Sequence, residues 1–339
     1  AYPDPMAPPV SPGKAFAALS KAQEQFYETH IRKQEMILTD LTEKWRWRLD
    51  TLDHALQPVV NLRTGICFGY EALIRNYQEA GFETIDDVFD AAFTDHVLHR
   101  VDLALRKKAI EKLRQLPWHE SVVLFYNVDS RLWDSKDFDH DNAVDLLKRL
   151  SFSAERICFE VSEKRPLVLT QQLMDIRRRL KVEGSLIAVD DCGAEFSGLR
   201  MMYHSEPDFI KVDRFFILDI NKNPRKKLFV SSIVNIAHRM GSLVIAEGVE
   251  TDEEAASCID LGCDLIQGYW IDRPATQMDG FVREYQDLKA FFSRYKRRGD
   301  YDDQSFIKSQ MKRIAPISLE TWLIDILEQF KTDPECRLL

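Results

Sequence analysis

Residues 55–75 read ALQPVVNLRTGICFGYEALIR, and this stretch decides the fold. It holds two apolar, strand-like runs, 55–62 and 66–74, which are separated only by the turn RTG at 63–65. Such a short turn suits a hairpin but is too short for the crossover that two parallel strands need. The sequence therefore predicts an antiparallel pair of strands at the start of a domain.

Six further strand-like runs follow this hairpin, and amphipathic stretches with helical spacing lie among them. The six runs are VVLFYN (122–127), RICFE (156–160), SLIAVDD (185–191), DFIKV (208–212), SLVIAE (242–247) and CDLIQGYW (263–270). The helical stretches are 98–116, 141–150, 167–183, 225–240 and 252–261. Strands that alternate with helices pair mostly in parallel. Eight strands over about 240 residues predict an α/β fold, a (β/α)8 TIM-type barrel with one antiparallel pair near its start.

The main alternative is a doubly wound open sheet, which also alternates strands and helices. Such folds bind nucleotides through a glycine-rich phosphate loop. The chain contains neither GxGxxG nor GxxxxGK followed by Ser or Thr. The barrel is therefore the favoured prediction.

Both ends of the chain lie outside the barrel pattern. Residues 1–12 are rich in proline, and from Lys14 to about Leu52 there is neither proline nor glycine, which predicts one long helix. That helix either packs on the neighbouring domain or acts as a signalling or dimerising helix. Further helices are expected over 276–295 and 304–333. The expected division is a leader with a long helix, a barrel and a helical C-terminal extension, at 1–52, 53–298 and 299–339.

Composition excludes several classes of function. The net charge is −9, from 46 basic and 55 acidic residues, so a DNA or RNA polymer is not an expected partner. No apolar run is long enough for a membrane span, and no secretory signal is visible, so we expect a cytoplasmic protein. The chain begins with Ala1 rather than Met, which suggests processing or an excerpt of a longer protein. The six cysteines form no CxxC pair and are expected to be buried, reduced thiols.

The ends of the strand-like runs carry the functional signal. Each position is an acid, an amide or a lysine: Glu71, Asn127, Glu160, Asp190, Asp191, Lys211, Glu247 and Gln267. The carboxyl ends of barrel strands meet at one rim, where barrel active sites lie. We therefore expect these side chains to gather in one pocket.

Carboxylates crowded into one pocket need a compensating cation, because like charges a few ångströms apart cannot all stay ionised. Oxygen ligands favour Mg²⁺ or Mn²⁺, and no HExxH motif or Cys/His cluster offers a zinc site. Adjacent Asp190 and Asp191 are candidates to bridge two ions, the usual clamp for in-line attack on a phosphodiester. Lys211 adds a fixed cation for the phosphate or the attacking water. A carboxylate-pair glycosidase is a weaker alternative, because it does not explain Asn127, Lys211 and the adjacent aspartates together.

Residues 57–274 resemble an EAL domain, the bacterial phosphodiesterase that opens cyclic di-GMP. The motifs stand in the family's order: YEALIR with Glu71, FYN with Asn127, EVSE, DDCG, KVD, EGVE and QGY. One three-letter match would mean little, whereas seven motifs in order are specific.

The resemblance implies a role for each of these positions. The first metal is held by Glu71, Asn127, Glu160 and Asp190, while Asp191 extends toward a second metal. Lys211 positions the nucleophilic water, and Glu247 acts as a base or metal partner. Gln267 orders water or metal at the far side of the site.

Further positions match substrate-binding and supporting residues of the family. Those expected to contact the dinucleotide are Gln57, Leu73, Arg75 and Asp213, with Arg75 on phosphate. Glu163 and Glu250 are expected to support the metal ligands, and Glu163 to anchor the loop after the paired aspartates.

Three positions depart from the family's usual residues: Cys192 replaces Phe, Glu195 replaces a small residue, and Asp129 replaces Ser. None of them is an expected metal ligand, so they bear on rate and regulation.

The resemblance implies hydrolysis of cyclic di-GMP to linear pGpG with two Mg²⁺ or Mn²⁺ ions. The alternative is a weak or inactive receptor that binds cyclic di-GMP and signals through protein partners. A homodimer is also expected, as is a regulatory or sensor domain in the full-length protein.

Overall fold

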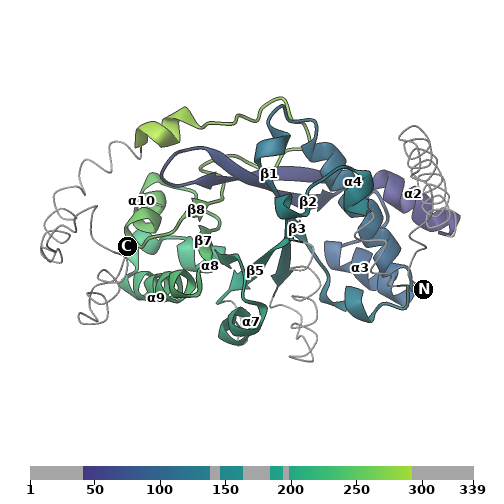
Figure 1. Cartoon of the computed structure of the whole chain (residues 1–339), viewed down its shortest axis with the longest axis horizontal. Helices are drawn as coiled ribbons and strands as arrows, with labels where there is room; N and C mark the ends of the chain where they lie inside the picture. Colours follow the sequence, from purple (N-terminus) through teal and green to yellow (C-terminus); the bar gives the residue numbers. More distant parts are fainter. Residues whose placement is uncertain (1–40, 138–145, 163–183, 194–197, 292–339) are drawn as a thin grey trace, which may run out of the picture. The chain divides into compact units, whose positions relative to one another are not determined.

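The protein is described by a computed structural model over residues 41–137, 146–162, 184–193 and 198–291 (Figure 1). Its strands close into a barrel in chain order, as the sequence predicts. They are β1 (Asp53–Asn61), β2 (Cys67–Arg75), β3 (Val123–Asn127), β4 (Ile157–Ser162), β5 (Leu186–Cys192), β6 (Phe209–Val212), β7 (Leu243–Ala246) and β8 (Leu265–Ile266). The TIM-type barrel is thereby confirmed, and the open sheet is excluded.

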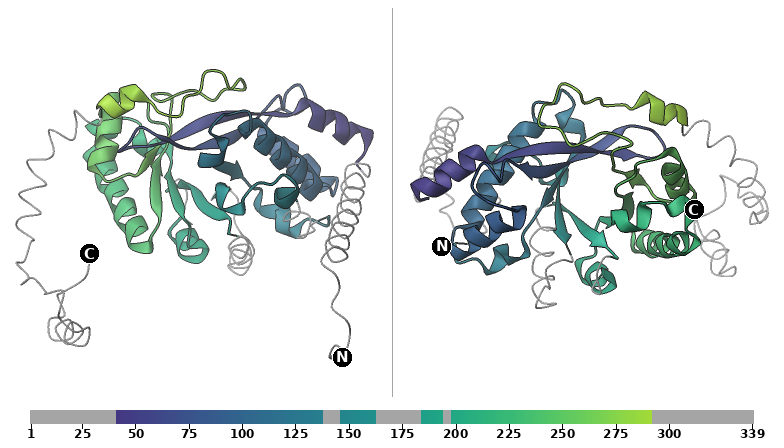
Figure 2. Two further views of the ribbon diagram at one scale, coloured as in Figure 1. Left: turned by 45° about the horizontal axis from the view of Figure 1, so that its top comes forward. Right: turned by 180° about the vertical axis from the view of Figure 1, so that it is seen from behind.

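The first strand runs opposite to the others, which confirms the predicted hairpin (Figure 2). β1 pairs antiparallel with β2 along its length, and with β8 only at Val60 and Asn61. The side chain of Asn61 accepts hydrogen bonds from the N–H groups of Arg63 and Thr64, which stabilises the turn. Because β1 is reversed, its early residues lie beside the carboxyl end of β2, and Gln57 faces Glu71 across the pair.

The helices of the described residues surround this barrel. Those whose bounds lie wholly within the described residues are α2 (Glu43–Thr51), α3 (Ile85–Thr94), α4 (Leu98–Leu113), α7 (Gly198–Ser205), α8 (Arg214–Ile217), α9 (Pro224–Met240) and α10 (Asp252–Asp260). Three of them match the expected stretches 98–116, 225–240 and 252–261. Of 141–150, the described part is helical at 146–149, whereas 167–183 lies outside the described residues.

The single long helix expected over 14–52 is wrong in its last part. α2 begins only at Glu43, because Thr42 has extended backbone angles and serves as the N-cap. Leu41, just before this break, is buried in the core together with Trp45 and Leu49 of α2. The described part of this segment therefore packs on the barrel, while residues 1–40 lie outside the described part of the chain.

The helix expected over 276–295 is also wrong in its first half. Residues 275–285 form a non-helical strap that bridges Leu56 of β1 at Ala275 and Ile66 of the hairpin turn at Glu284, and helical residues begin at 286 (Figure 1). β8 covers only the end of β1, so the edge of β1 needs another partner. The strap supplies it through paired hydrogen bonds between Leu56 and Ala275. The expected tail at 304–333 and the extension at 299–339 lie outside the described residues.

The barrel interior below the rim is filled by apolar side chains. One core cluster contains Val59, Phe125, Cys158, Ala188, Phe209, Ile245 and Leu265. The rings of Phe125 and Phe209 meet edge to face with centroids 5.3 Å apart. The five cysteines of the described residues are buried and form no disulfide, as expected, and Cys336 lies outside. None of the described helices has the length and apolar character needed to cross a membrane.

His54 on β1 is a buried histidine with a stability consequence. Its side chain is fully buried, and neither ring nitrogen has a hydrogen-bond partner among the described residues. Burial lowers the pKa of His54 from 6.5 to about 4. Between these two pKa values the unfolded chain binds a proton that the folded chain excludes. The contribution of His54 to the free energy of unfolding is therefore fully present above pH 6.5 and is lost as the pH falls toward 4.

We predict that His54→Leu removes part of the acid sensitivity of folding. Urea unfolding of both proteins at pH 7 and pH 5 measures this. Over that interval the wild type should lose about 2 kcal/mol more free energy of unfolding than the variant. Equal losses in the two proteins would show that His54 is not the titrating group.

Candidate active site

A buried lysine organises the rim at the carboxyl ends of the strands. Lys211 on β6 is only 1% exposed, and its Nζ contacts carboxylates from four other segments of the barrel. The distances are 2.7 Å to Glu160, 2.8 Å to Glu247, and 3.3 Å to both Glu71 and Asp190. The structure thus brings together acids carried by β2, β4 and β5 and the acid that follows β7.

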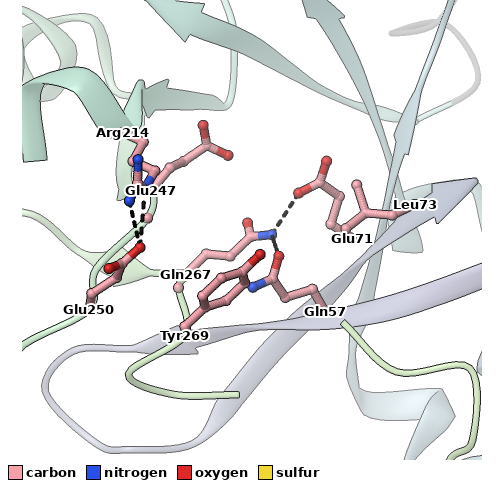
Figure 3. A pocket seen from close by; sticks show the side chains of 10 residues that line it. Gln57, Glu71, Leu73, Arg214, Glu247, Glu250, Gln267 and Tyr269 are labelled. Atoms are coloured by element: carbon pink, nitrogen blue, oxygen red, sulfur yellow. Dashed lines mark hydrogen bonds and ion pairs between the residues drawn. The ribbon is translucent and has the colours of Figure 1, made fainter. Parts of the chain in front are cut away.

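Two amide side chains connect further members of this group. Nδ2 of Asn127 donates to Glu71 at 2.9 Å and to Glu160 at 3.0 Å. Nε2 of Gln267 donates to Glu71 at 2.6 Å and to Gln57 at 3.0 Å (Figure 3). Both amides, predicted from strand ends, therefore lie within hydrogen-bonding distance of Glu71.

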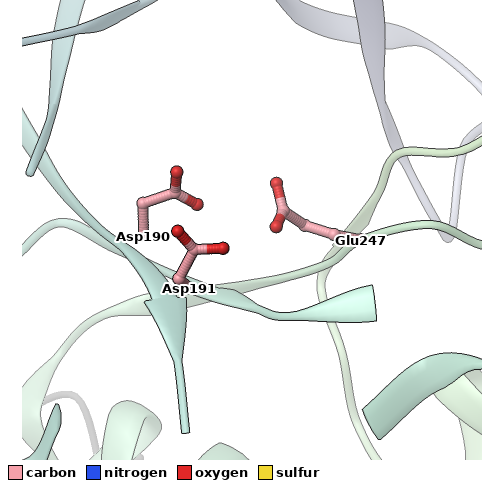
Figure 4. Close-up of side chains that lie close together, drawn as sticks. All are labelled: Asp190, Asp191 and Glu247. Atoms are coloured by element: carbon pink, nitrogen blue, oxygen red, sulfur yellow. The ribbon is translucent and has the colours of Figure 1, made fainter. Parts of the chain in front are cut away.

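The paired aspartates both reach the same rim. One oxygen each from Asp190, Asp191 and Glu247 lies within 4.8 Å of the others (Figure 4). Successive strand residues normally point to opposite faces. Here the pairing register shifts between Val189 and Cys192, and Asp191 has a left-handed φ of 54°. The bulge turns both carboxylates toward the site.

The rim holds more acidic side chains than one lysine can balance. Burial raises the pKa of Glu160 well above its usual value, and burial also raises the pKa of Asp190 and brings that of Glu247 to about 8. Burial would raise the pKa of Glu71 too, but Lys211 and the amide hydrogen bonds outweigh it and lower that pKa. The surrounding acids hold the pKa of Lys211 well above its ordinary value, despite its burial.

This donor set fits a hard divalent cation. Carboxylate and amide oxygens are the ligands that Mg²⁺, Mn²⁺ and Ca²⁺ prefer. Oε1 of Gln267 is buried and accepts no hydrogen bond from the described residues, which leaves it available to a cation or water. Turning over the amide of Asn127 exchanges its oxygen and nitrogen, so Oδ1 would face Glu71 and Glu160 instead.

Two cavities open beside these residues, and Leu73 lines both. The larger, of about 470 Å³, is lined by Gln57, Glu71, Leu73, Arg214, Glu247, Gly248, Glu250, Gln267, Gly268 and Tyr269. The smaller, of about 350 Å³, is lined by Ala72, Leu73, Ile74, Ile85, Asp86, Phe89, Asn127, Val128, Asp129, Ser130, Ser162, Asp190 and Asp191. Gln57 and Leu73, two of the predicted substrate contacts, therefore border open space.

The other predicted contacts lie elsewhere. Arg75 donates a hydrogen bond to the carbonyl of Ile74, and Asp213 accepts one from the N–H of Phe215 at the start of α8. Neither residue lines either cavity, so their contact with a dinucleotide stays a prediction. Glu163 lies outside the described residues.

Sequence reasoning missed two residues of the larger cavity. Arg214 lines its wall and donates to Glu250 at 2.7 Å (Figure 3). The half-exposed Tyr269 also lines it, and the guanidinium of Arg273 lies over its ring. Arg214 directly follows the KVD motif, and Tyr269 closes QGY. Their motifs were found, but nothing in the sequence showed that these side chains turn toward the cavity.

Two of the departures from the family pattern have local partners. Cys192 is buried, and its Sγ lies 3.7 Å from Sδ of Met202, so the two sulfur side chains fill apolar space together. Asp129 accepts two hydrogen bonds from the guanidinium of Arg131, which also pairs with Asp90. The extra negative charge at Asp129 is therefore neutralised locally. Glu195 lies outside the described part of the chain.

We predict that Lys211→Met strongly destabilises the metal-free protein. The variant leaves four buried carboxylates without their cation, a change that typically costs 3–5 kcal/mol, so roughly this loss is expected. Thermal unfolding in a chelator measures it, and Mn²⁺ should restore part of the midpoint. Lys222→Met, which removes a lysine whose side chain is 73% exposed, is the control. Equal midpoints for the two variants in chelator would contradict the prediction.

Comparisons with known proteins agree with this geometry. A family model described as EAL domain matches residues 41–274. The cyclic di-GMP phosphodiesterase RocR of Pseudomonas aeruginosa is 29% identical over 232 residues, covering 64% of this chain and 56% of that protein. Klebsiella pneumoniae BlrP1, solved with calcium and cyclic di-GMP, is 30% identical with a TM-score of 0.60, covering 67% and 57%. BlrP1 is also solved with manganese and cyclic di-GMP, at a TM-score of 0.58 and 30% identity over 66% and 56%.

The chain spans only part of its curated relatives. It covers 35% of the cyclic di-GMP phosphodiesterase NbdA of Pseudomonas aeruginosa and 56% of RocR.

Proposed function

The chain belongs to the EAL domain family, and we propose that it is a phosphodiesterase that hydrolyses cyclic di-GMP to linear pGpG. One observation carries the proposal: the residues expected to bind metal and water gather around Lys211 with none replaced. The relatives named as cyclic di-GMP phosphodiesterases support the choice of substrate.

We propose that the rim holds two Mg²⁺ or Mn²⁺ ions. Glu71, Asn127, Glu160 and Asp190 would hold the first, and Asp191 and Glu247 would face the second. When bound, such ions supply positive charge to the phosphate and lower the pKa of water. Solved complexes of BlrP1 contain calcium or manganese together with cyclic di-GMP, which supports a divalent ion at this site.

The chain's own side chains would then perform the remaining tasks. Lys211 orients the attacking water, and Glu247 accepts its proton. The water oxygen forms a bond to phosphorus, and the bond from phosphorus to the ribose 3′ oxygen breaks. That oxygen takes up a proton from solvent water and becomes the 3′ hydroxyl of pGpG. Gln57, Leu73, Arg75 and Asp213 bind the dinucleotide, with Arg75 on phosphate, while Glu163 supports the metal ligands. The carboxylate of Glu250, which the sequence assigned to the same supporting role, pairs instead with Arg214.

The second candidate function is a receptor that holds cyclic di-GMP without cutting it. The observation in its favour is Cys192, which replaces the family's Phe directly after the paired aspartates. A smaller side chain there leaves the Asp191 backbone with less apolar packing.

We also propose a homodimer in which the α8–α9 face, defined by Phe215, Leu228 and Phe229, is buried. These side chains are 66%, 69% and 44% exposed in the single chain. Clustered exposed apolar side chains of this kind mark interaction surfaces. A regulatory or sensor domain in a longer protein would fit the partial coverage of the relatives.

We predict that Glu71→Ala abolishes turnover. Changing residues that merely support metal ligands costs 10–100-fold, so removing a ligand should cost more than about 100-fold. Chromatographic assay of pGpG formed with Mg²⁺ or Mn²⁺ measures this, and a chelator should stop the wild type. Glu111→Ala, on the exposed side of α4, is the matched control and should keep full activity. Binding of cyclic di-GMP by the wild type without any product would instead establish the receptor function.

We predict that Leu228→Asp converts the dimer to a monomer, because the charge would be buried without a partner. Light scattering gives the mass of each protein in solution. Val282→Asp changes an apolar residue outside the face, itself 44% exposed, and should leave the mass unchanged. A monomeric wild type, or a dimeric Leu228→Asp protein, would refute this interface.

A further inference from the structure

Arg214 and Glu250 form an ion pair on the wall of the larger cavity (Figure 3). Nη2 of Arg214 lies 2.7 Å from Oε1 of Glu250, and Nε lies 3.2 Å from the same oxygen. Glu71, Glu247 and Gln267 line the same cavity. The pair therefore borders the space in which the proposed substrate would lie.

The backbone at Gly248 holds Arg214 in this place. Gly248 has a left-handed φ of 68°, and a Cβ added there would lie 2.3 Å from Cγ of Arg214. The stem of Arg214 thus runs directly across the glycine. Any side chain at Gly248 would displace the guanidinium from the wall.

Arg214 is the one cation among the described residues that line the larger cavity, beside the acids Glu71, Glu247 and Glu250. Lys211 lies close by, but it is buried and its ammonium group already contacts four carboxylates. The side chains of Arg214 and Glu250 are 53% and 34% exposed. Exposed ion pairs contribute little to stability, so exchanging this contact for a ligand contact costs little.

Because Arg214 donates hydrogen bonds and Glu250 accepts them, this wall suits a part of a nucleotide that offers acceptors and donors side by side. A phosphate would meet Arg214 favourably but would be repelled by Glu250 and Glu247. A guanine edge offers O6 and N7 as acceptors and, next to them, N1–H and the N2 amino group as donors. Adenine reverses this order, with an amino group at N6 and an acceptor at N1. Tyr269 adds an aromatic surface to the same wall.

We propose, on the basis of the function proposed above, that Arg214 and Glu250 together read one guanine base of the substrate. Arg214 donates to O6 and N7, and Glu250 accepts from N1–H and the N2 amino group. The two side chains are thus specificity determinants, which exchange their mutual ion pair for the guanine edge when the nucleotide enters.

Nucleotide preference tests this proposal. Initial rates are measured with cyclic di-GMP, with cyclic di-AMP and with bis(4-nitrophenyl) phosphate, which is a phosphodiester without a purine. Arg214→Lys keeps the charge but cannot make the forked contact, and Glu250→Gln keeps the shape but loses the paired acceptor. Each variant should lower kcat/KM for cyclic di-GMP roughly tenfold or more, mainly through a higher KM. The ratio of kcat/KM for cyclic di-GMP to that for cyclic di-AMP should fall by the same factor. Rates on bis(4-nitrophenyl) phosphate should not change.

Lys222→Met serves as the control, because this exposed lysine lines neither cavity and should leave all three rates unchanged. An unchanged preference for cyclic di-GMP in both variants would overturn the proposal. A parallel loss on all three substrates would also overturn it, because that result indicates a purely structural role.

Failure of the proposed function has a different signature, namely a wild type that does not cut cyclic di-GMP. Calorimetric binding of cyclic di-GMP and cyclic di-AMP to the same proteins then measures the preference without turnover. A wild-type preference for cyclic di-GMP that both variants lose supports base reading. An equal affinity of the wild type for the two nucleotides overturns it.

Discussion

The contact between Lys211 and four carboxylates is the constraint on which the site depends. One ammonium group lies among Glu71, Glu160, Asp190 and Glu247, which come from different strands or from the loop after one. The ammonium group and the carboxylates of Glu71 and Glu160 are almost fully buried, so losing the nitrogen leaves unbalanced buried charge. The arrangement orders the rim before any ion or substrate arrives, and it leaves excess negative charge that divalent cations can offset.

The reversed first strand completes this rim. A parallel β1 would place its early residues at the opposite end of the barrel, away from the carboxylates. Antiparallel pairing sets Gln57 opposite Glu71, where its side chain accepts a hydrogen bond from Gln267. The reversal leaves the edge of β1 poorly covered by β8, and Ala275, at the start of the strap, forms a bridge with Leu56 on that edge. In this chain, residues that follow the eighth strand therefore cover part of that edge.

The parts of the structure that sequence could predict are those governed by periodicity and by strand direction. Polar residues at strand ends predicted the rim, because parallel strands bring equivalent ends together. The break before Glu43 and the strap at 275–285 could not be predicted, since both follow from burial of Leu41 and from the bare edge of β1. Arg214 was missed for a similar reason. Its direction depends on the absence of a side chain at Gly248, a residue far along the chain.

The α8–α9 face and the paired aspartates belong to one packed unit. Gly193, two residues after Asp191, has a left-handed φ of 95°, and a Cβ there would lie 2.7 Å from the ring of Phe216. Phe216 stacks on Phe229 with ring centroids 4.5 Å apart, and Phe229 belongs to the exposed face. Gly193 thus lies against aromatic side chains, and the ring of Phe229 is partly exposed in the single chain. A partner that covered this face would contact Phe229, and through the Phe216–Phe229 stack it would adjoin the packing of Gly193, two residues after Asp191.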